Sequence, residues 1–140
     1  MAAFFPVDAR NVLIENCHGY AYNPGNGSDY LFDLFKVTNS TIRNCYAERA
    51  YAFPLGAHRS RSIILQAGSD NNLVQNFSSK NLRLQLENAR NNTLEDLHLI
   101  GDNKNINSGG IQIYSQSNDN IFKNVYMSGE GIQFLGDIIT

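Results

Sequence analysis

The sequence is poor in the residues that usually dominate small scaffolds or binding patches. It contains no tryptophan, three prolines and two cysteines in 140 residues, and only 17% of its residues are charged. Two cysteines are too few for a disulfide-rich scaffold. A net charge of −2, without a basic patch interleaved with aromatics, argues against nucleic acid as the main partner. We therefore expect one domain, residues 1–140, that does not bind nucleic acid.

Long hydrophobic runs are also missing. No apolar run approaches the roughly 18 residues that indicate a membrane-spanning helix. The first residues, MAAFFPV, are too few and lack the basic start of a signal peptide. The sequence therefore predicts no membrane span and no signal peptide in this chain.

Asparagine, by contrast, recurs in a fixed pattern that is written five times. The segments are NVLIENCHGY from Asn11, NSTIRNCYAE from Asn39, NNLVQNFSSK from Asn71, NNTLEDLHLI from Asn91 and DNIFKNVYMS from Asp119. Each has a central amide or acid, with an apolar residue two positions before it and one position after it. The segments start 28, 32, 20 and 28 residues apart. A constant pattern at an irregular period predicts repeated short strands joined by loops of variable length.

A second alternating run precedes each Asn-bearing turn. These runs are YLFDLFKV, SIILQAG, NLRLQLEN, GIQIYSQS and a last GIQFLGD. Alternation of apolar and polar residues predicts strands, and the Asn, Asp and Ser residues between the runs predict turns. No stretch shows the periodicity of a helix, which excludes an α-helical solenoid. One coil is thus predicted to consist of a strand, an Asn turn, a strand, a corner and a variable loop.

The central residue of each repeat needs a special explanation, because the apolar residues on both sides of it should point inward. A bend must therefore fall on it. Successive coils lie about 4.8 Å apart, so equivalent amides can hydrogen-bond along the axis, and a buried amide is tolerated when it is paired. We expect an internal stack along the coils, formed by Asn16, Asn44, Asn76, Asp96 and Asn124.

The pattern N-x-x-I-x-N followed by an apolar residue resembles the right-handed parallel β-helix superfamily, over about Asn11 to Asp137. That superfamily includes pectate-lyase-like enzymes, sugar epimerases and bacteriophage tailspikes. The resemblance implies an all-β, right-handed parallel β-helix of about five to six coils, in a virion or extracellular setting. Exposed strand edges at both ends of a β-helix favour pairing, so we expect either a segment of a longer protein or a homo-oligomer, and the resemblance makes a trimer the first expectation. It does not fix the function, because one scaffold carries many chemistries.

Three long loops, which start near His18, Tyr46 and Leu99, should leave the coils at one corner. The first two are rich in aromatic and charged residues, which suits a polysaccharide or oligosaccharide ligand. The expected ligand-binding residues are Tyr20, Tyr22, Tyr30, Arg49, Tyr51, His58, Arg59 and Arg61. Glycoside hydrolysis needs two carboxylates about 5–9.5 Å apart, and the candidates are Asp29, Asp33 and Glu48. We expect a sugar-binding module; the alternatives are a lyase, glycoside hydrolase or epimerase, and a structural spacer without ligand.

Several residues fall in columns whose role the sequence leaves open. Cys17 and Cys45 share one inward column, either as two small core residues or as a disulfide between adjacent coils. A zinc site with His18 is disfavoured, because His18 should face outward, and neither a metal nor a cofactor is predicted. Two outward columns are expected to be solvated, or else a binding or subunit-contact strip: His18, Tyr46, Ser78, His98 and Tyr126, and Glu15, Arg43, Gln75, Glu95 and Lys123.

Overall fold

The computed structural model describes residues 2–21, 30–49, 61–101, 109–129 and 131–135. Within these ranges the only regular elements are β-strands: Ala2–Phe4 (β1), Val7–Arg10 (β2), Leu13–Glu15 (β3), His18–Ala21 (β4), Tyr30–Thr38 (β5), Thr41–Arg49 (β6), Arg61–Gln66 (β7), Leu73–Lys80 (β8), Arg83–Glu87 (β9), Thr93–Ile100 (β10), Gly110–Tyr114 (β11), Ile121–Ser128 (β12) and Gly131–Leu135 (β13). The described part of the chain contains no helix that could span a membrane.

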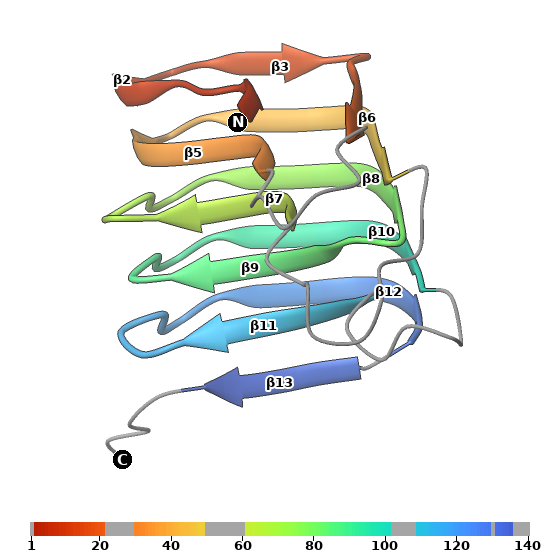
Figure 1. The fold of residues 1–140 in the computed structure, drawn as a ribbon. Helices are drawn as coiled ribbons and strands as arrows, with labels where there is room; N and C mark the ends of the chain where they lie inside the picture. Colours follow the sequence, from red (N-terminus) through yellow and green to blue (C-terminus); the bar gives the residue numbers. More distant parts are fainter. Residues whose placement is uncertain (1, 22–29, 50–60, 102–108, 130, 136–140) are drawn as a thin grey trace.

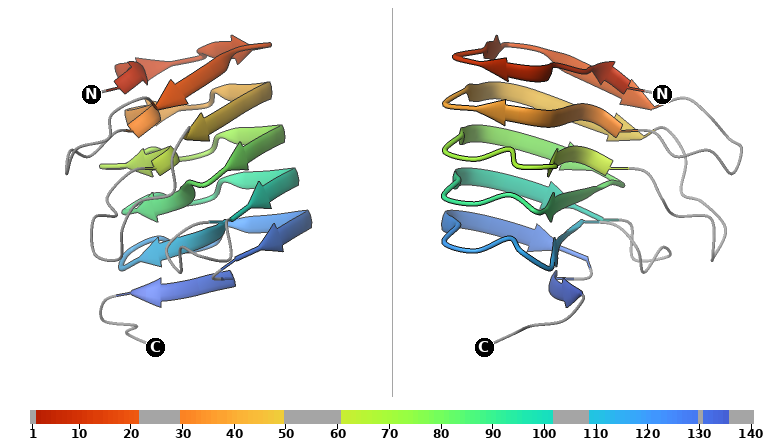
Figure 2. Two further views of the ribbon diagram at one scale, coloured as in Figure 1. Left: turned by 45° about the vertical axis from the view of Figure 1, so that its right-hand side comes forward. Right: turned by 90° about the vertical axis from the view of Figure 1, so that its left-hand side faces the viewer.

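The strands form two parallel sheets, and the chain alternates between them (Figures 1 and 2). One sheet has seven strands in the order β1-β5-β7-β9-β11-β13, with β2 also paired to β5. The other has six strands in the order β12-β10-β8-β6-β3, with β4 also paired to β6. We call one strand region from each sheet, taken in chain order, a coil. The second alternating runs of the sequence lie in the seven-stranded sheet and the Asn-bearing segments in the six-stranded sheet, as the repeat predicts.

The register confirms the alignment of the sequence repeats. The apolar residues two positions before each central residue pair along the six-stranded sheet as Ile14, Ile42, Val74, Leu94 and Phe122. Equivalent positions therefore stack on one another even though the segments between coils differ in length.

The hydrophobic core lies between the two sheets. Phe32 and Leu34 enter it from the seven-stranded sheet, and Ile42 and Phe77 enter it from the six-stranded sheet, each at most 1% exposed. The ring of Phe32 stacks on Phe4 at 4.7 Å and meets Phe77 edge-on at 5.5 Å. Full burial of one such side chain contributes roughly 1.5–3 kcal/mol, so successive coils are held together mainly by this shared core.

The expected internal stack of central residues is wrong in its location. Asn16, Asn44, Asn76, Asp96 and Asn124 are all exposed. The bend that was predicted is present, because each has a left-handed backbone with φ between 49° and 57°. A residue in that conformation, between two inward-facing positions, turns its own side chain to the outside. Neighbouring coils still pair there: Asn76 Nδ2 donates to Asn44 Oδ1 at 2.9 Å, and Asn124 Nδ2 donates to Asp96 Oδ1 at 2.7 Å.

The internal stack lies four positions earlier, at the buried Ser40, Asn72 and Asn92 and the half-buried Asn120, and we call it the inner amide ladder. The backbone N–H of Ser40 donates to Asn72 Oδ1, that of Asn72 to Asn92 Oδ1 and that of Asn92 to Asn120 Oδ1, each at 2.9 Å. The amide Nδ2 groups of the three asparagines donate to the carbonyls of Val37, Ser69 and Ala89 at 2.8–3.0 Å. Each ladder residue therefore satisfies polar backbone groups of its neighbours at the turn between the sheets.

We expect Asn92→Ala to destabilise the protein by about 2–4 kcal/mol, because Asn92 is 0% exposed and its loss leaves the Asn72 N–H and the Ser69 carbonyl unsatisfied. Asn76→Gly is the matched control, since glycine adopts the left-handed backbone freely and only an exposed hydrogen bond is lost. Urea denaturation followed by circular dichroism measures both. Equal midpoints for the two variants would contradict a dominant role for the inner ladder.

Ser79→Ala should stabilise the protein by about 1 kcal/mol. Ser79 is 1% exposed, and its hydroxyl has no hydrogen-bond partner in the described part of the chain, so its burial costs free energy that alanine avoids. Ser69→Ala is the matched control with the opposite sign, because the Ser69 hydroxyl accepts from Val37 N at 3.1 Å and donates to Leu34 O at 2.8 Å. The melting temperatures of the two variants should move in opposite directions.

Candidate functional site

The outer face of the seven-stranded sheet carries a row of polar side chains that crosses the strands. Ile63 and Leu65 point into the core, so their neighbours on β7 project outward. The register continues this outward row along the sheet through Asp33, Gln85, Gln112 and Gln133, and the buried Ile64 occupies the β7 position between Asp33 and Gln85. An adjacent outward row contains Val7, Phe35, Gln66 and Glu87.

Hydrogen bonds on these rows form two neighbouring groups, which together we call the outer polar network: Asp33 with Gln66, and Arg61 with Gln85, Glu87, Gln112 and Gln133. Arg61 donates from Nε to Gln85 Oε1 and from Nη2 to Gln112 Oε1, the latter at 3.1 Å. Gln112 Nε2 donates to Gln133 Oε1 at 3.1 Å. Gln85 Nε2 donates to Glu87 Oε2 at 2.9 Å, and Gln66 Nε2 donates to Asp33 Oδ1 at 2.7 Å. The network therefore links β5 to β7, and β7 through β9 and β11 to β13.

Several members are much less accessible than residues of an ordinary solvated face. Asp33, Arg61 and Gln85 are each 6% exposed. Burial raises the pKa of the Asp33 carboxyl, and the hydrogen bond from Gln66 opposes this shift. Burial, together with the neighbouring Arg83, lowers the pKa of the Arg61 guanidinium. Charged and amide groups are thus held in fixed positions in partly desolvated surroundings, where their hydrogen bonds are stronger than in water.

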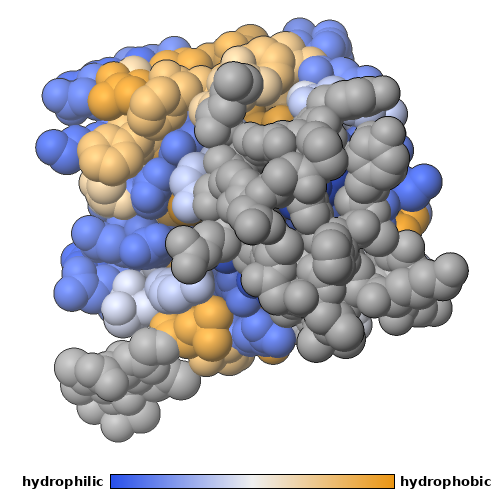
Figure 3. Space-filling model, in the orientation of Figure 1, coloured by the Kyte–Doolittle hydropathy of each residue, from blue (hydrophilic) through white to orange (hydrophobic). Residues whose placement is uncertain are grey.

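An apolar and aromatic area borders the network. Phe5 and Val7 are 55% and 49% exposed, and Phe35 is half-buried beside them. Figure 3 shows hydrophobic residues gathered over β2 and β5, next to hydrophilic ones on the same face. Tyr30, at the start of β5, and Tyr114, at the end of β11, add half-buried aromatic side chains. Polar donors and acceptors and aromatic rings are therefore present on one sheet.

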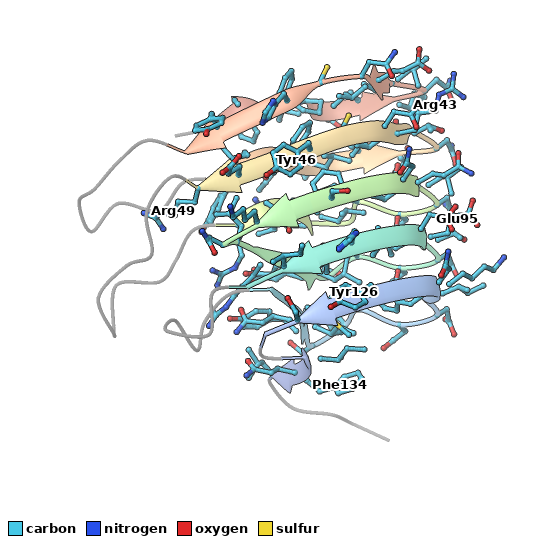
Figure 4. All side chains as sticks on the ribbon, turned by 90° about the vertical axis from the view of Figure 1, so that its right-hand side faces the viewer. Arg43, Tyr46, Arg49, Glu95, Tyr126 and Phe134 are labelled. Carbon is cyan, nitrogen blue, oxygen red and sulfur yellow. The ribbon has the colours of Figure 1, made fainter. Side chains whose placement is uncertain are left out.

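The outer face of the six-stranded sheet has a different character. His18 meets Tyr46 edge-on at 4.6 Å, and His98 meets Tyr126 edge-on at 4.8 Å. Figure 4 shows Tyr46 and Tyr126 on strands that face the viewer, with Arg43 and Glu95 near one end of the sheet. These contacts join pairs of neighbouring coils, and no polar network of comparable length occurs among the described residues of this face.

Charged groups on this second face are paired locally. Arg43 forms an ion pair with Glu15, and Gln75 Nε2 donates to Glu95 Oε1 at 2.8 Å. Tyr46 Oη donates to Glu48 Oε2 at 3.0 Å. Burial and the nearby Glu48 carboxylate raise the pKa of Tyr46 to about 12, so this phenol stays protonated near neutral pH.

The structure places the predicted site residues in three groups. Tyr30, Asp33 and Arg61 lie on the seven-stranded sheet, as parts or neighbours of the outer polar network. Tyr20 and Glu48 lie on the six-stranded sheet, so Asp33 and Glu48 belong to different sheets. Arg49 lies at the end of β6 and is 3% exposed (Figure 4). The remaining predicted residues lie outside the described residues: Tyr22, Asp29, Tyr51, His58 and Arg59.

Sequence reasoning missed the glutamines of the network. Their signal was present, because Gln85, Gln112 and Gln133 each stand between two apolar residues, in LQL, IQI and IQF. Read as strands, these triplets place one glutamine at the same outward position of three successive coils. The described residues contain no group of three or more His, Cys, Asp or Glu side chains that could hold a metal ion.

Comparison of the chain with protein-family models, with curated proteins and with solved structures gives no match. The geometry of the chain's own residues is therefore the basis for assigning a role to the outer polar network.

Asp33→Asn should flatten the pH dependence of stability. Because the folded-state pKa of Asp33 is raised above the unfolded value near 3.9, its contribution to the unfolding free energy is largest below that value. It falls as the pH rises through the folded-state pKa. Asparagine keeps an acceptor for Gln66 and never ionises, so the variant should be the more stable protein at neutral pH.

Urea denaturation at pH 3.5 and pH 7 measures the effect. Gln66→Leu is the matched control: removing the donor to the Asp33 carboxylate should steepen the loss of stability between the same two pH values. A pH dependence that is unchanged in both variants would contradict the desolvated environment assigned to Asp33.

Proposed function

We propose that the chain is a right-handed parallel β-helix module that recognises a polysaccharide on the outer face of its seven-stranded sheet. Two parallel sheets with the chain alternating between them support the β-helix. The right-handed sense follows the general preference of connections between parallel strands. The observation that carries the function is the outer polar network beside aromatic side chains.

The chemistry of this face suits a sugar. Carbohydrate hydroxyls both donate and accept hydrogen bonds, and the network offers amides, which do both, together with a guanidinium donor and carboxylate acceptors. Sugar rings also have apolar faces, which pack against aromatic rings such as Phe35, Tyr30 and Tyr114. Since most network members already hydrogen-bond one another, the donors and acceptors are ordered before a ligand binds, which lowers the entropic cost of binding.

The dimensions of the network favour a polymer over a single sugar. It extends from Asp33 on β5 to Gln133 on β13, across four strand spacings. At about 4.8 Å per spacing, this is a row of about 19 Å. A linear saccharide lying across the strands would contact equivalent positions of successive coils, so a repeating ligand matches a repeating surface.

Hydrolysis is a second candidate function, favoured by Asp33. A buried carboxyl with a raised pKa suits a general acid, and Glu87 on the same outer face, held by Gln85, supplies a second carboxylate. Asp33 and Glu87 are two strands and two residues apart in the register, or about 12 Å between Cα atoms. Their side chains must therefore lean toward each other to reach the separation of roughly 6.5–9.5 Å found between the carboxyl groups of inverting glycosidases. In this second candidate Glu87 takes the role that sequence analysis gave to Glu48.

The purified chain should bind at least one member of a panel of bacterial capsule and lipopolysaccharide preparations, measured by affinity electrophoresis. Phe35→Ala and Gln133→Ala, which change two partly exposed residues, should each weaken that binding about 5- to 30-fold, the effect of losing about 1–2 kcal/mol from one contact. Tyr126→Ala is the matched control, because it removes an exposed aromatic from the other sheet. If the chain also releases new reducing ends from the bound polysaccharide, and Asp33→Asn abolishes this release, the protein hydrolyses its ligand as well as binding it. Weakening by Tyr126→Ala alone would place the site on the six-stranded sheet and contradict the proposal.

The homo-oligomer, with a trimer as first expectation, and the virion or extracellular setting stay predictions. Size-exclusion chromatography with light scattering tests the first of them, since a trimer has three times the 15.6 kDa mass of the chain.

A further inference from the structure

We infer that Cys17 and Cys45 form a disulfide site that can join the first coil to the second under oxidising conditions. Both are free thiols in this structure. The inference concerns the stability of the first coil and is independent of the proposed recognition of a polysaccharide.

The backbone places the two cysteines side by side. Residues on either side of them are paired in register, Glu15 with Arg43 and His18 with Tyr46. The N–H of Tyr46 also donates to the carbonyl of Cys17 at 3.0 Å. Neighbouring parallel strands lie about 4.8 Å apart, which falls within the Cα separations of roughly 4.4–6.8 Å found in disulfides.

The side chains point the same way. Cys45 belongs to the core, and Cys17 is packed against it. Each thiol donates to the carbonyl two residues before it, Cys17 Sγ to Glu15 O at 3.3 Å and Cys45 Sγ to Arg43 O at 3.2 Å. The two sulfurs therefore occupy equivalent positions on adjacent coils, and a rotation of either side chain does not have to cross the sheet.

The first coil can make the small adjustment that a bond requires. Cys17 lies in the break between β3 and β4, whereas Cys45 lies within the continuous strand β6. The first coil also has a neighbouring coil on one side only within the described residues. Movement of Cys17 toward Cys45 therefore disturbs fewer contacts than movement of Cys45 would.

The difference in burial sets the order of the reaction. Cys45 is 3% exposed, and burial raises the pKa of its thiol, whereas Cys17 is partly exposed. The Cys17 thiolate attacks one sulfur of a small disulfide such as oxidised glutathione, giving a mixed disulfide and one glutathione thiolate. The Cys45 thiolate then attacks the Cys17 sulfur and expels the second glutathione. Two protein thiols are oxidised, and one glutathione disulfide is reduced to two glutathione molecules.

Closing this bond constrains the unfolded chain, since the cysteines are 28 residues apart in the sequence. A loop of that length should raise the melting temperature by about 5–10 °C. It should also slow hydrogen exchange in β3, β4 and the facing part of β6 more than elsewhere, because the bond acts on the first two coils directly.

The test incubates the full chain with oxidised glutathione and analyses a non-reducing digest by mass spectrometry. We expect a cross-linked peptide pair containing Cys17 and Cys45, lighter by two hydrogen atoms than the separate thiol peptides, together with the rise in melting temperature. Cys45→Ala should stop at a Cys17–glutathione adduct and show no rise. Cys17→Ser should react with glutathione slowly or not at all.

Three results would overturn the inference. One is a wild-type chain that keeps a Cys17–glutathione adduct while Cys45 remains a free thiol after denaturation. Another is a disulfide that links two copies of the chain. The third is formation of the Cys17–Cys45 bond with no change of melting temperature in the wild type relative to Cys45→Ala. Because the digest reads the bond directly, poor folding of one variant does not obscure the outcome.

Discussion

Everything else in this structure depends on satisfying the backbone polar groups at the turn where the chain passes from one sheet to the other. At that turn the backbone enters the core, where an unpaired N–H costs about 1–3 kcal/mol. The inner amide ladder pairs these groups with one residue per coil. Each asparagine Oδ1 accepts from a backbone N–H of the preceding coil, and each Nδ2 donates to a backbone carbonyl. Once the backbone polar groups of the turn are hydrogen-bonded in this way, successive coils can stack at the spacing of neighbouring strands. The alternation of inward and outward residues along each strand then forms the core.

The coils could be predicted from the sequence because equivalent residues have the same structural role in each coil. The apolar pairs around the central residue and the alternating runs before it identify the strands and their register. The location of the buried amide row could not be predicted in the same way. The exposed central column repeats more regularly, with four Asn and one Asp, than the inner column, which has three Asn, Ser40 and Val12. Asn92 and Asp96 differ only in whether the backbone bend carries the side chain inward or outward, and the pattern of residue types does not contain that information.

The candidate site was harder to predict than the fold because it is not a local feature of the sequence. Arg61 and Gln112 are far apart in the chain, as are Asp33 and Gln66, and each pair comes together only when the coils stack. Aromatic and charged loops drew attention to one corner, whereas the hydrogen-bonded residues lie on the strands beside it. Asp33 illustrates the difference: it was expected as a catalytic candidate, and it is outward-facing on its strand yet only 6% exposed.

Parallel pairing between neighbours has a mechanical consequence. Each described strand pairs only with strands of the coil before and the coil after it, and the backbone hydrogen bonds between coils run along the stacking axis. A pulling force along that axis therefore acts on all the inter-coil interfaces in series, and the weakest interface opens first. A force applied across the axis, along the strands, loads a whole row of hydrogen bonds in shear at once. The molecule should be compliant along its length and stiff across it, so the direction in which a tethered partner pulls would decide whether the coils hold or unwind.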